Sequence, residues 1–146
     1  MKVTIGIILY KTKYLDQSLK SLLEQDYKDL EILLRDHEEG VYSAATYVKE
    51  HFPTLKVQKT KNLWHSKGQN AMAKAAKGEI YICGSNDMFY PKNFVSQVVK
   101  HIKQSNYELF SPLILRWDYP SQKTETIDTC GIQVDRALRF ADIGLQ

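Results

Sequence analysis

The chain has 146 residues, 43% of them apolar, which is enough to bury a core and too few for two full-sized domains. Its 20 basic and 17 acidic residues give a net charge of +3 without a basic block, so we expect no nucleic-acid partner. The apolar run at 3–9 is too short for a signal peptide or a membrane span. Cys83 and Cys130 show no metal-ligand spacing. We therefore expect one compact cytoplasmic domain over residues 1–146.

The first elements alternate between strand and helix patterns. Residues 3–9 are β-branched and almost wholly apolar, which is typical of a strand covered on both faces. An amphipathic helix is expected at about 14–25, and its apolar stripe consists of Leu15, Leu19, Leu22 and Leu23. A second strand at 30–34 is expected to stop at the polar segment 35–37.

The next elements carry helix-start and helix-end signals. Ser43 is a suitable N-cap for a helix that runs to about Phe52, and 55–59 is expected to form a weak edge strand. Ser66 and Gln69 match a capping box, which predicts an alanine-rich helix that Gly78 ends.

Residues 78–89 read GEIYICGSNDMF, an apolar run that ends in Ser85-Asn86-Asp87 and is expected to form a buried strand. Pro91 suits the first turn of the helix that follows, whose inward residues are Phe94, Val95, Val98, Val99 and Ile102. Further strands are expected at 109–115 and 127–134, with a polar loop at 118–125 between them.

Alternating strands and helices predict an α/β fold with a largely parallel sheet and helices on both faces. Ligands of such sheets bind outside the carboxyl ends of the strands. Three loops leave those ends with polar groups, at 10–11, 35–37 and 85–87. Asp87 is suited to a hard divalent metal that also binds phosphate oxygens. Capping of the helix that begins near Pro91 explains the spacing of Asp87 equally well.

Three segments in this order resemble family 2 glycosyltransferases of the GT-A fold, especially the rhamnosyltransferase-like branch. They are VTIGIILYKTKYLDQSLKSLLEQDYKDLEILLRDH, NLWHSKGQNAMAKAAKGE and IYICGSNDMFYP, and a weaker likeness continues through IDTCGIQVDRALRFADIGL. The resemblance implies a GT-A (Rossmann-like) three-layer α/β/α sandwich. It also implies inverting transfer of a sugar from a nucleotide diphosphate donor, assisted by Mg²⁺ or Mn²⁺.

The resemblance also assigns site residues. The nucleotide base is expected at Leu9, Tyr10, Asp36 and His37. The metal-binding motif of the family matches 85–87, with Asp87 at the metal position and Asn86 where a second acidic residue often contacts ribose or phosphate. Ser85 belongs to the same motif. The polar segment before the helix beneath the diphosphate supplies Asn62, Gly68 and Asn70.

Several positions depart from the family pattern. His37 stands where aspartate or asparagine is common, so the acceptor for a pyrimidine N3 proton would be a neutral imidazole, a backbone carbonyl or Asp36. Asn86 leaves one carboxylate where two often share the metal, which predicts weak metal binding without a diphosphate. Lys11 replaces a frequent asparagine, and Trp64 replaces a frequent glycine.

No catalytic base is assigned. In the family the base comes from an acidic pair well beyond the metal motif, in a segment that this chain does not contain, so the chain is expected to be C-terminally truncated relative to the family. The downstream aspartates match no motif, and they are Asp118, Asp128, Asp135 and Asp142.

The expected partners follow from the family. They are a UDP- or dTDP-type sugar donor and a saccharide or lipid-linked acceptor, with cell-surface polysaccharide synthesis as the setting, in the cytoplasm or at the inner face of the membrane. An apolar flank left by a missing acceptor half would favour homo-oligomers. The alternative is a noncatalytic nucleotide-sugar-binding remnant or subunit. A receiver-like or flavodoxin-like module leaves the asparagine and glycine segment unexplained.

Overall fold

The strand β1 (Val3–Leu9) pairs in parallel with a strand on each side in this computed structural model, which describes residues 1–37, 43–120, 122–129 and 131–143. Its neighbours are β2 (Leu30–Asp36) and β4 (Ile80–Ser85), and β3 (Val57–Lys59) lies outside β2, in the order β3-β2-β1-β4. A flavodoxin-like sheet would place β3 beside β1. The flavodoxin-like and receiver-like alternatives are therefore wrong.

The chain forms two compact units, residues 1–105 and 106–146, and each is described by itself. The first unit contains the parallel sheet and all four described helices. Compact units can belong to one domain, so the expectation of a single domain over 1–146 stays a prediction.

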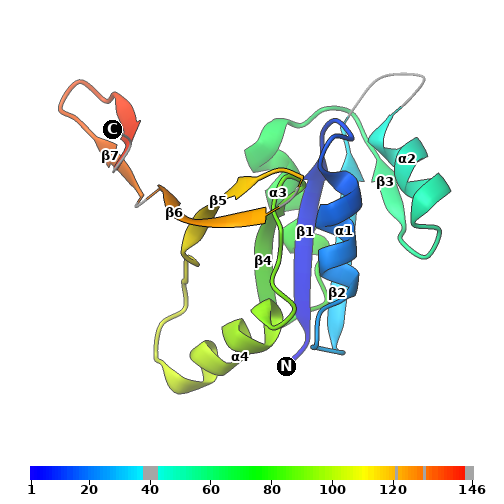
Figure 1. Cartoon of the computed structure of the whole chain (residues 1–146), viewed down its shortest axis with the longest axis horizontal. Coiled ribbons are helices and arrows are strands. Elements are labelled where there is room, and N and C mark those ends of the chain that lie inside the picture. The colour runs from blue at the N-terminus through cyan, green and yellow to red at the C-terminus, as the bar shows by residue number, and fades with distance from the viewer. Residues whose placement is uncertain (38–42, 121, 130, 144–146) are drawn as a thin grey trace. The chain divides into compact units, whose positions relative to one another are not determined.

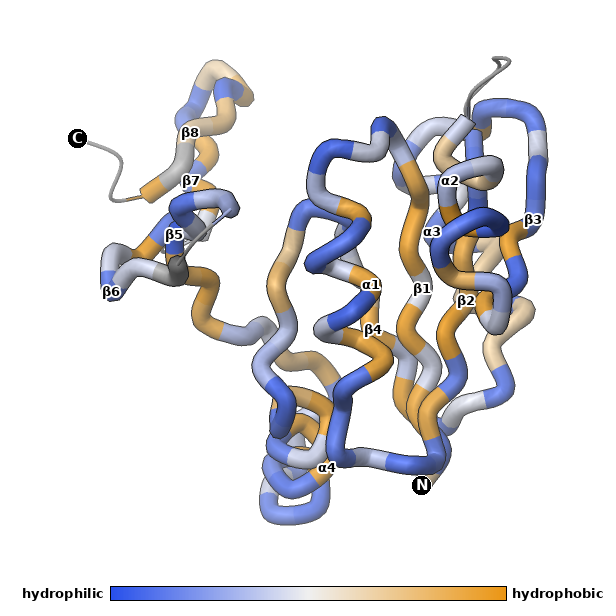
Figure 2. The backbone as a smooth tube through the Cα atoms, turned by 45° about the vertical axis from the view of Figure 1, so that its right-hand side comes forward, coloured by the Kyte–Doolittle hydropathy of each residue, from blue (hydrophilic) through white to orange (hydrophobic). Residues whose placement is uncertain are grey.

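One face of the sheet carries the hydrophobic core. The helices α1 (Leu15–Leu23), α2 (Ala44–His51) and α4 (Phe94–Gln104) share one buried cluster with the odd-numbered residues of β1. Side chains alternate between the faces of a strand, which explains why Val3, Ile5, Ile7 and Leu9 are all fully buried together. Figure 2 shows β1 and β2 as mostly hydrophobic tubes beside helices of mixed character.

The opposite face of the sheet is covered by α3 (Trp64–Ala75), which packs on β1. Figure 1 shows α1 in front of the sheet and α3 behind it. A Cβ atom on Gly68 would lie 2.6 Å from both Ile8 Cδ1 and His37 Cε1, so the helix approaches the sheet closely at this glycine. The expected three-layer α/β/α arrangement with a mostly parallel sheet is confirmed.

The starts of α2 and α3 are stabilised by different hydrogen bonds. Ser43 caps α2 as predicted, and its side chain accepts a hydrogen bond from Thr46 N. The capping box at Ser66 is wrong, because α3 begins earlier, at Trp64, and its N-cap residue makes no side-chain hydrogen bond. The Asn62 side chain instead accepts a hydrogen bond from Trp64 N at 2.8 Å. At its other end α3 stops at Ala75, before the predicted Gly78.

Other expectations in the first unit need correction. Leu23 is 48% exposed, so it lies beside the buried stripe of α1 and not in it. Arg35 and Asp36 belong to β2, because both pair with β1. The strand β4 is only partly buried and Cys83 is exposed, since β4 is the outer strand of the described sheet. Pro91 precedes α4, which begins at Phe94.

The second unit is built from two antiparallel pairs, β5 (Ile114–Asp118) with β6 (Gln122–Thr129) and β7 (Ile132–Val134) with β8 (Phe140–Asp142). The expected loop at 118–125 is therefore wrong in its second half, where β6 lies. The expected strand at 127–134 is divided near Gly131, whose φ of +115° favours glycine. Within the described residues, no helix is long and apolar enough to cross a membrane.

The two serines provide a test of these helix starts. Ser43→Ala should lower the free energy of unfolding by about 1 kcal/mol, because the α2 start loses its side-chain acceptor. Ser66→Ala is the matched control and should change it by less than about 0.5 kcal/mol, because Ser66 is exposed inside α3. Urea unfolding followed by circular dichroism measures both values. Equal losses in the two variants would contradict the assigned caps.

Candidate functional site

The loops that leave β1 and β4 are tied together by Asn86. Its Nδ2 atom donates to the backbone oxygen of Tyr10 at 2.8 Å and lies 3.5 Å from that of Lys11. Because β1 and β4 are adjacent and parallel, both loops emerge at the carboxyl edge of the sheet. The Asn86 amide nitrogen is thus engaged by the protein, and its predicted contact with ribose or phosphate stays a prediction.

Asp87 is exposed beside this bridge, and its carboxylate accepts a hydrogen bond from Ser85 Oγ. The backbone of Ser85 is fixed from the other side, because the Tyr90 hydroxyl accepts from its nitrogen and donates to its oxygen. Burial raises the pKa of Tyr90 to about 12, so this hydroxyl stays protonated. The N-cap of α4 is Asn93, so the alternative in which Asp87 caps that helix is wrong.

Asp87 is a lone charged ligand candidate. Within the parts of the chain that the structure describes, no group of three or more His, Cys, Asp or Glu side chains could hold a metal ion. Mg²⁺ and Mn²⁺ prefer several oxygen ligands, and Mg²⁺ is commonly held by one or two carboxylates together with substrate phosphates. One exposed carboxylate with a neighbouring hydroxyl fits a metal of that kind, which takes further ligands from a diphosphate.

The end of β2 is buried. Asp36 is 1% exposed, and its Oδ2 atom accepts a hydrogen bond from Ala45 N at 2.9 Å, at the start of α2. His37 is 7% exposed and packs against Gly68 of α3, and its Nε2 atom has no hydrogen-bond partner. Burial and the neighbouring Arg35 lower the pKa of His37, which keeps the ring neutral at pH 7.

The remaining predicted residues differ in accessibility. The Leu9 side chain is fully buried in the core, whereas the Tyr10 side chain is 62% exposed just after β1. Asn62 and Asn70 are exposed before and within α3, and Gly68 is buried. The structure thus brings the ends of β1, β2 and β4 to one edge, where Tyr10 and Asp87 are exposed and Leu9, Asp36 and His37 are buried.

Sequence reasoning missed the hydrogen bonds by which Gln69 joins α3 to the sheet. The Gln69 side chain, 6% exposed, accepts a hydrogen bond from the Tyr81 hydroxyl at 2.6 Å. Its Nε2 atom lies 3.4 Å from Gly6 O and 3.3 Å from Gly84 O. Gly84 immediately precedes Ser85, so these hydrogen bonds reach the base of the Asp87 loop. The available signal was helical spacing, because Gln69 lies between Gly68 and Met72 on the sheet-facing side of α3.

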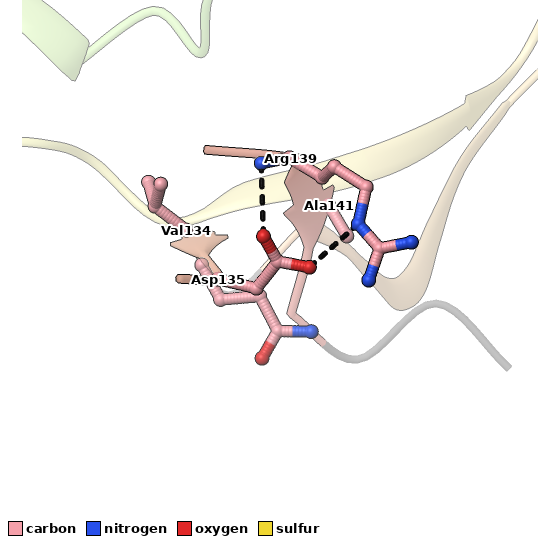
Figure 3. Close-up of a pocket in the computed structure, with 5 residues that line it drawn as sticks. Val134, Asp135, Arg139 and Ala141 are labelled. Carbon is pink, nitrogen blue, oxygen red and sulfur yellow. Dashed lines mark hydrogen bonds and ion pairs between the residues drawn. The ribbon is translucent and has the colours of Figure 1, made fainter. Parts of the chain in front are cut away.

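The described residues also line two surface hollows. One of about 520 Å³ is lined by Ala45, Thr46, Lys49, Glu50 and Lys59, beside α2 and β3. The other, of about 350 Å³, lies in the second unit and is shown in Figure 3, lined by Gln133, Val134, Asp135, Arg139 and Ala141. Hydrogen bonds from the backbone and side chain of Arg139 lower the pKa of Asp135. A carboxylate stabilised in this way is a poor general base.

Comparisons with known proteins agree with this architecture. The family model described as Glycosyl transferase family 2 matches residues 4–130. No match emerges among curated proteins. Residues 1–349 of S. aureus TarS superpose with a TM-score of 0.61 at 23% identity, covering 71% of this chain and 33% of that one.

Two further solved structures were determined with nucleotide ligands. The UDP complex of TarS 1–349 has a TM-score of 0.60 at 21% identity and covers 71% of this chain and 32% of that one. The mannosyltransferase PcManGT from Pyrobaculum calidifontis, in complex with GDP-Man and Mn²⁺, has a TM-score of 0.57 at 23% identity and covers 68% and 31%. The chain therefore spans about a third of these relatives.

The burial of His37 predicts a pH dependence of stability. Its pKa in the folded protein is below the usual value near 6.5, so the unfolded chain binds the proton more readily. The free energy of unfolding should therefore fall as the pH is lowered from 7 to 5. His37→Gln should flatten this fall, and His101→Gln, at an exposed position on α4, should not. Urea titrations across the pH range measure the slopes, and parallel slopes for wild type and His37→Gln would refute the prediction.

Proposed function

The chain belongs to glycosyl transferase family 2, and we propose that the carboxyl edge of its parallel sheet binds a nucleotide-diphosphate sugar for transfer to a saccharide or lipid-linked acceptor. The observation that carries this proposal is the Asn86 bridge, which holds the loops of β1 and β4 together beside the exposed carboxylate of Asp87. The UDP and GDP-Man complexes of the two solved relatives support a ligand of this class.

The nucleoside of a UDP- or dTDP-type donor would lie over the ends of β1 and β2. Tyr10 offers an exposed ring there, and Leu9 offers its backbone because its side chain is in the core. Asp36 and His37 are buried beneath this position. Their role in the proposal is to support the pocket: Asp36 fixes the start of α2, and His37 separates β2 from α3 at Gly68.

The diphosphate would lie between the first turn of α3 and the Asp87 loop. The first N–H groups of a helix lack partners within the helix and favour anions. Asn62 fixes that first turn through Trp64 N, and Gly68 lets the helix approach the sheet. The exposed amide of Asn70, the Ser85 hydroxyl and the Asn86 oxygen complete the polar groups proposed for the donor.

Asp87 would hold Mg²⁺ or Mn²⁺ together with the donor phosphates, and such an ion would neutralise the charge that develops on the departing nucleotide. The Ser85 hydroxyl orients the Asp87 carboxylate, and the Tyr90 hydroxyl fixes the Ser85 backbone beneath it. These residues prepare the carboxylate before the donor arrives, which limits the reorganisation needed on binding.

The setting of the reaction is also a proposal. Transfer with inversion, in cell-surface polysaccharide synthesis at the cytoplasmic side of the membrane, agrees with the family. No residue is assigned as the general base. Asp128 lies 3.6 Å from Arg116 in an ion pair, and Asp135 is bonded to Arg139, so neither carboxylate resembles a base that is poised to accept a proton.

A noncatalytic donor-binding role is the second candidate, and the ion-paired state of the downstream carboxylates Asp128 and Asp135 favours it, whereas the retained Asp87 favours chemistry. Incubation with a panel of UDP-, dTDP- and GDP-sugars and Mn²⁺ separates the two functions. Release of nucleoside diphosphate, in the presence or absence of an acceptor, supports a transferase. Tight donor binding without any release supports the noncatalytic role.

Asp87→Asn provides the direct test of the metal position. The variant should bind UDP in the presence of Mn²⁺ on the order of tenfold or more weakly, because a neutral amide is a poor ligand for a hard cation. Asp29→Asn is the matched control, since Asp29 is exposed at the opposite edge of the sheet, just before β2. Titration calorimetry with and without Mn²⁺ measures both. Equal affinities for wild type and Asp87→Asn would exclude Asp87 as the metal ligand.

A further inference from the structure

The carboxyl edge of the sheet is unusually rich in exposed aromatic side chains. Among the described residues of the first unit, the exposed large hydrophobic side chains are Met1, Tyr10, Leu23, Trp64 and Phe89. The three aromatic members all lie near the carboxyl ends of strands: Tyr10 follows β1, Trp64 opens α3, and Phe89 follows the Asp87 loop. The described surface elsewhere in this unit exposes no such ring.

Trp64 is held in an unusual backbone conformation. Its φ is +57°, in the left-handed region that large side chains rarely adopt, and its side chain is 78% exposed. The Asn62 side chain accepts the hydrogen bond from Trp64 N and thereby fixes this turn. The indole therefore adds no buried packing that would explain a bulky residue at a strained position, where glycine would be unstrained.

The place of Trp64 follows from the chain order. The strand β3 is parallel to β2, so α3, which follows β3, starts at the carboxyl edge of the sheet. Gly68, one turn into α3, approaches His37 at the end of β2 and Ile8 near the end of β1. Trp64 opens the helix one turn before Gly68, so its exposed indole lies at the carboxyl edge, near the place proposed for the nucleoside.

Among the described residues at the end of β2, the side chains that could read the edge of a base are engaged or buried. Asp36 is 1% exposed and accepts a hydrogen bond from Ala45 N. The His37 Nε2 atom is buried beside α3, away from solvent. Among the described residues at this place, the exposed rings are those of Trp64 and Tyr10, and the Lys11 ammonium lies 5.2 Å from the centroid of the Tyr10 ring. Stacking on an aromatic side chain accepts any base, because every base has a π-face.

From these observations we infer that Trp64 is the platform on which the donor base stacks, and that the site accepts purine and pyrimidine nucleoside diphosphates with similar affinity. The inference rests on the proposed function and names its ligand class more broadly than a UDP- or dTDP-type donor. Stacking on the Trp64 ring sets the affinity for the nucleotide, and the buried end of β2 discriminates little between one base and another.

The chain contains two tryptophans, so a single substitution leaves one tryptophan as a fluorescent reporter. Trp117→Phe leaves Trp64 as the single tryptophan. In this background, titration with UDP or GDP in the presence of Mn²⁺ should quench the fluorescence, and the two dissociation constants should agree within about threefold. A second set of titrations by calorimetry uses otherwise wild-type protein that carries Trp64→Gly, Trp64→Phe or Tyr107→Ala.

Trp64→Gly should weaken the binding of both nucleotides by about tenfold to a hundredfold, and Trp64→Phe should retain most of the affinity. The Tyr107→Ala control removes a ring that is 76% exposed in the second unit and should change nothing. The thermal midpoint of Trp64→Gly should be unchanged or higher, because glycine relieves the left-handed conformation. A lower midpoint would show a structural role for the indole and overturn the inference.

Other outcomes separate this inference from the proposed function. If wild type binds neither nucleotide, both fail. If Trp64→Gly binds UDP as tightly as wild type does, the inference fails and the proposed function stands. The same holds if wild type binds UDP more than tenfold tighter than it binds GDP. Unchanged nucleotide binding in Trp64→Gly with lost binding to vesicles of anionic phospholipid would assign the indole to a membrane surface and likewise overturn the inference.

Discussion

The close fit of α3 against the face of the sheet that carries Gly6, Ile8 and Tyr81 is the constraint on which the candidate site depends. A Cβ atom on Gly6 would lie 2.1 Å from the Tyr81 hydroxyl oxygen, so only glycine leaves room for that ring beside β1. The ring in turn places its hydroxyl 2.6 Å from Gln69 Oε1 on α3. A neutral hydrogen bond contributes about 1 kcal/mol net, but a buried partner left unsatisfied costs about 1–3 kcal/mol, so Gly6, Tyr81 and Gln69 act together.

The two faces of the sheet therefore contribute differently to the fold. The face toward α1, α2 and α4 is apolar and supplies the hydrophobic stabilisation through fully buried residues such as Ile5 and Ile7. The face toward α3 determines where that helix lies, because directional hydrogen bonds fix the helix over β1 and β4. The start of α3 and the loop that carries Asp87 are therefore held by the same contacts, and Asn86 adds the tie to the β1 loop.

Local pattern was enough to predict the parallel sheet, the α2 cap at Ser43 and the place of Asp87 beyond a strand end. The contacts that decide the site were not predictable in this way. Asn86 reaches a backbone oxygen 76 residues away, and the burial of His37 depends on a glycine in another helix. The hairpin from Ile114 to Thr129 was missed because the expected loop at 118–125 is polar and its strand β6 has no apolar run until Ile127.

Hydrogen exchange with and without UDP and Mn²⁺ tests the central claim most directly, because it maps the bound surface without any substitution. We expect slower exchange on ligand binding in three segments, 9–11, 62–66 and 85–88, which lie at the carboxyl edge of the sheet. Exchange in segments 26–29 and 76–79, which precede β2 and β4 at the opposite edge of the sheet, should stay unchanged. Protection confined to either of those regions, with none at the carboxyl edge, would contradict a nucleotide site built on β1, α3 and the Asp87 loop.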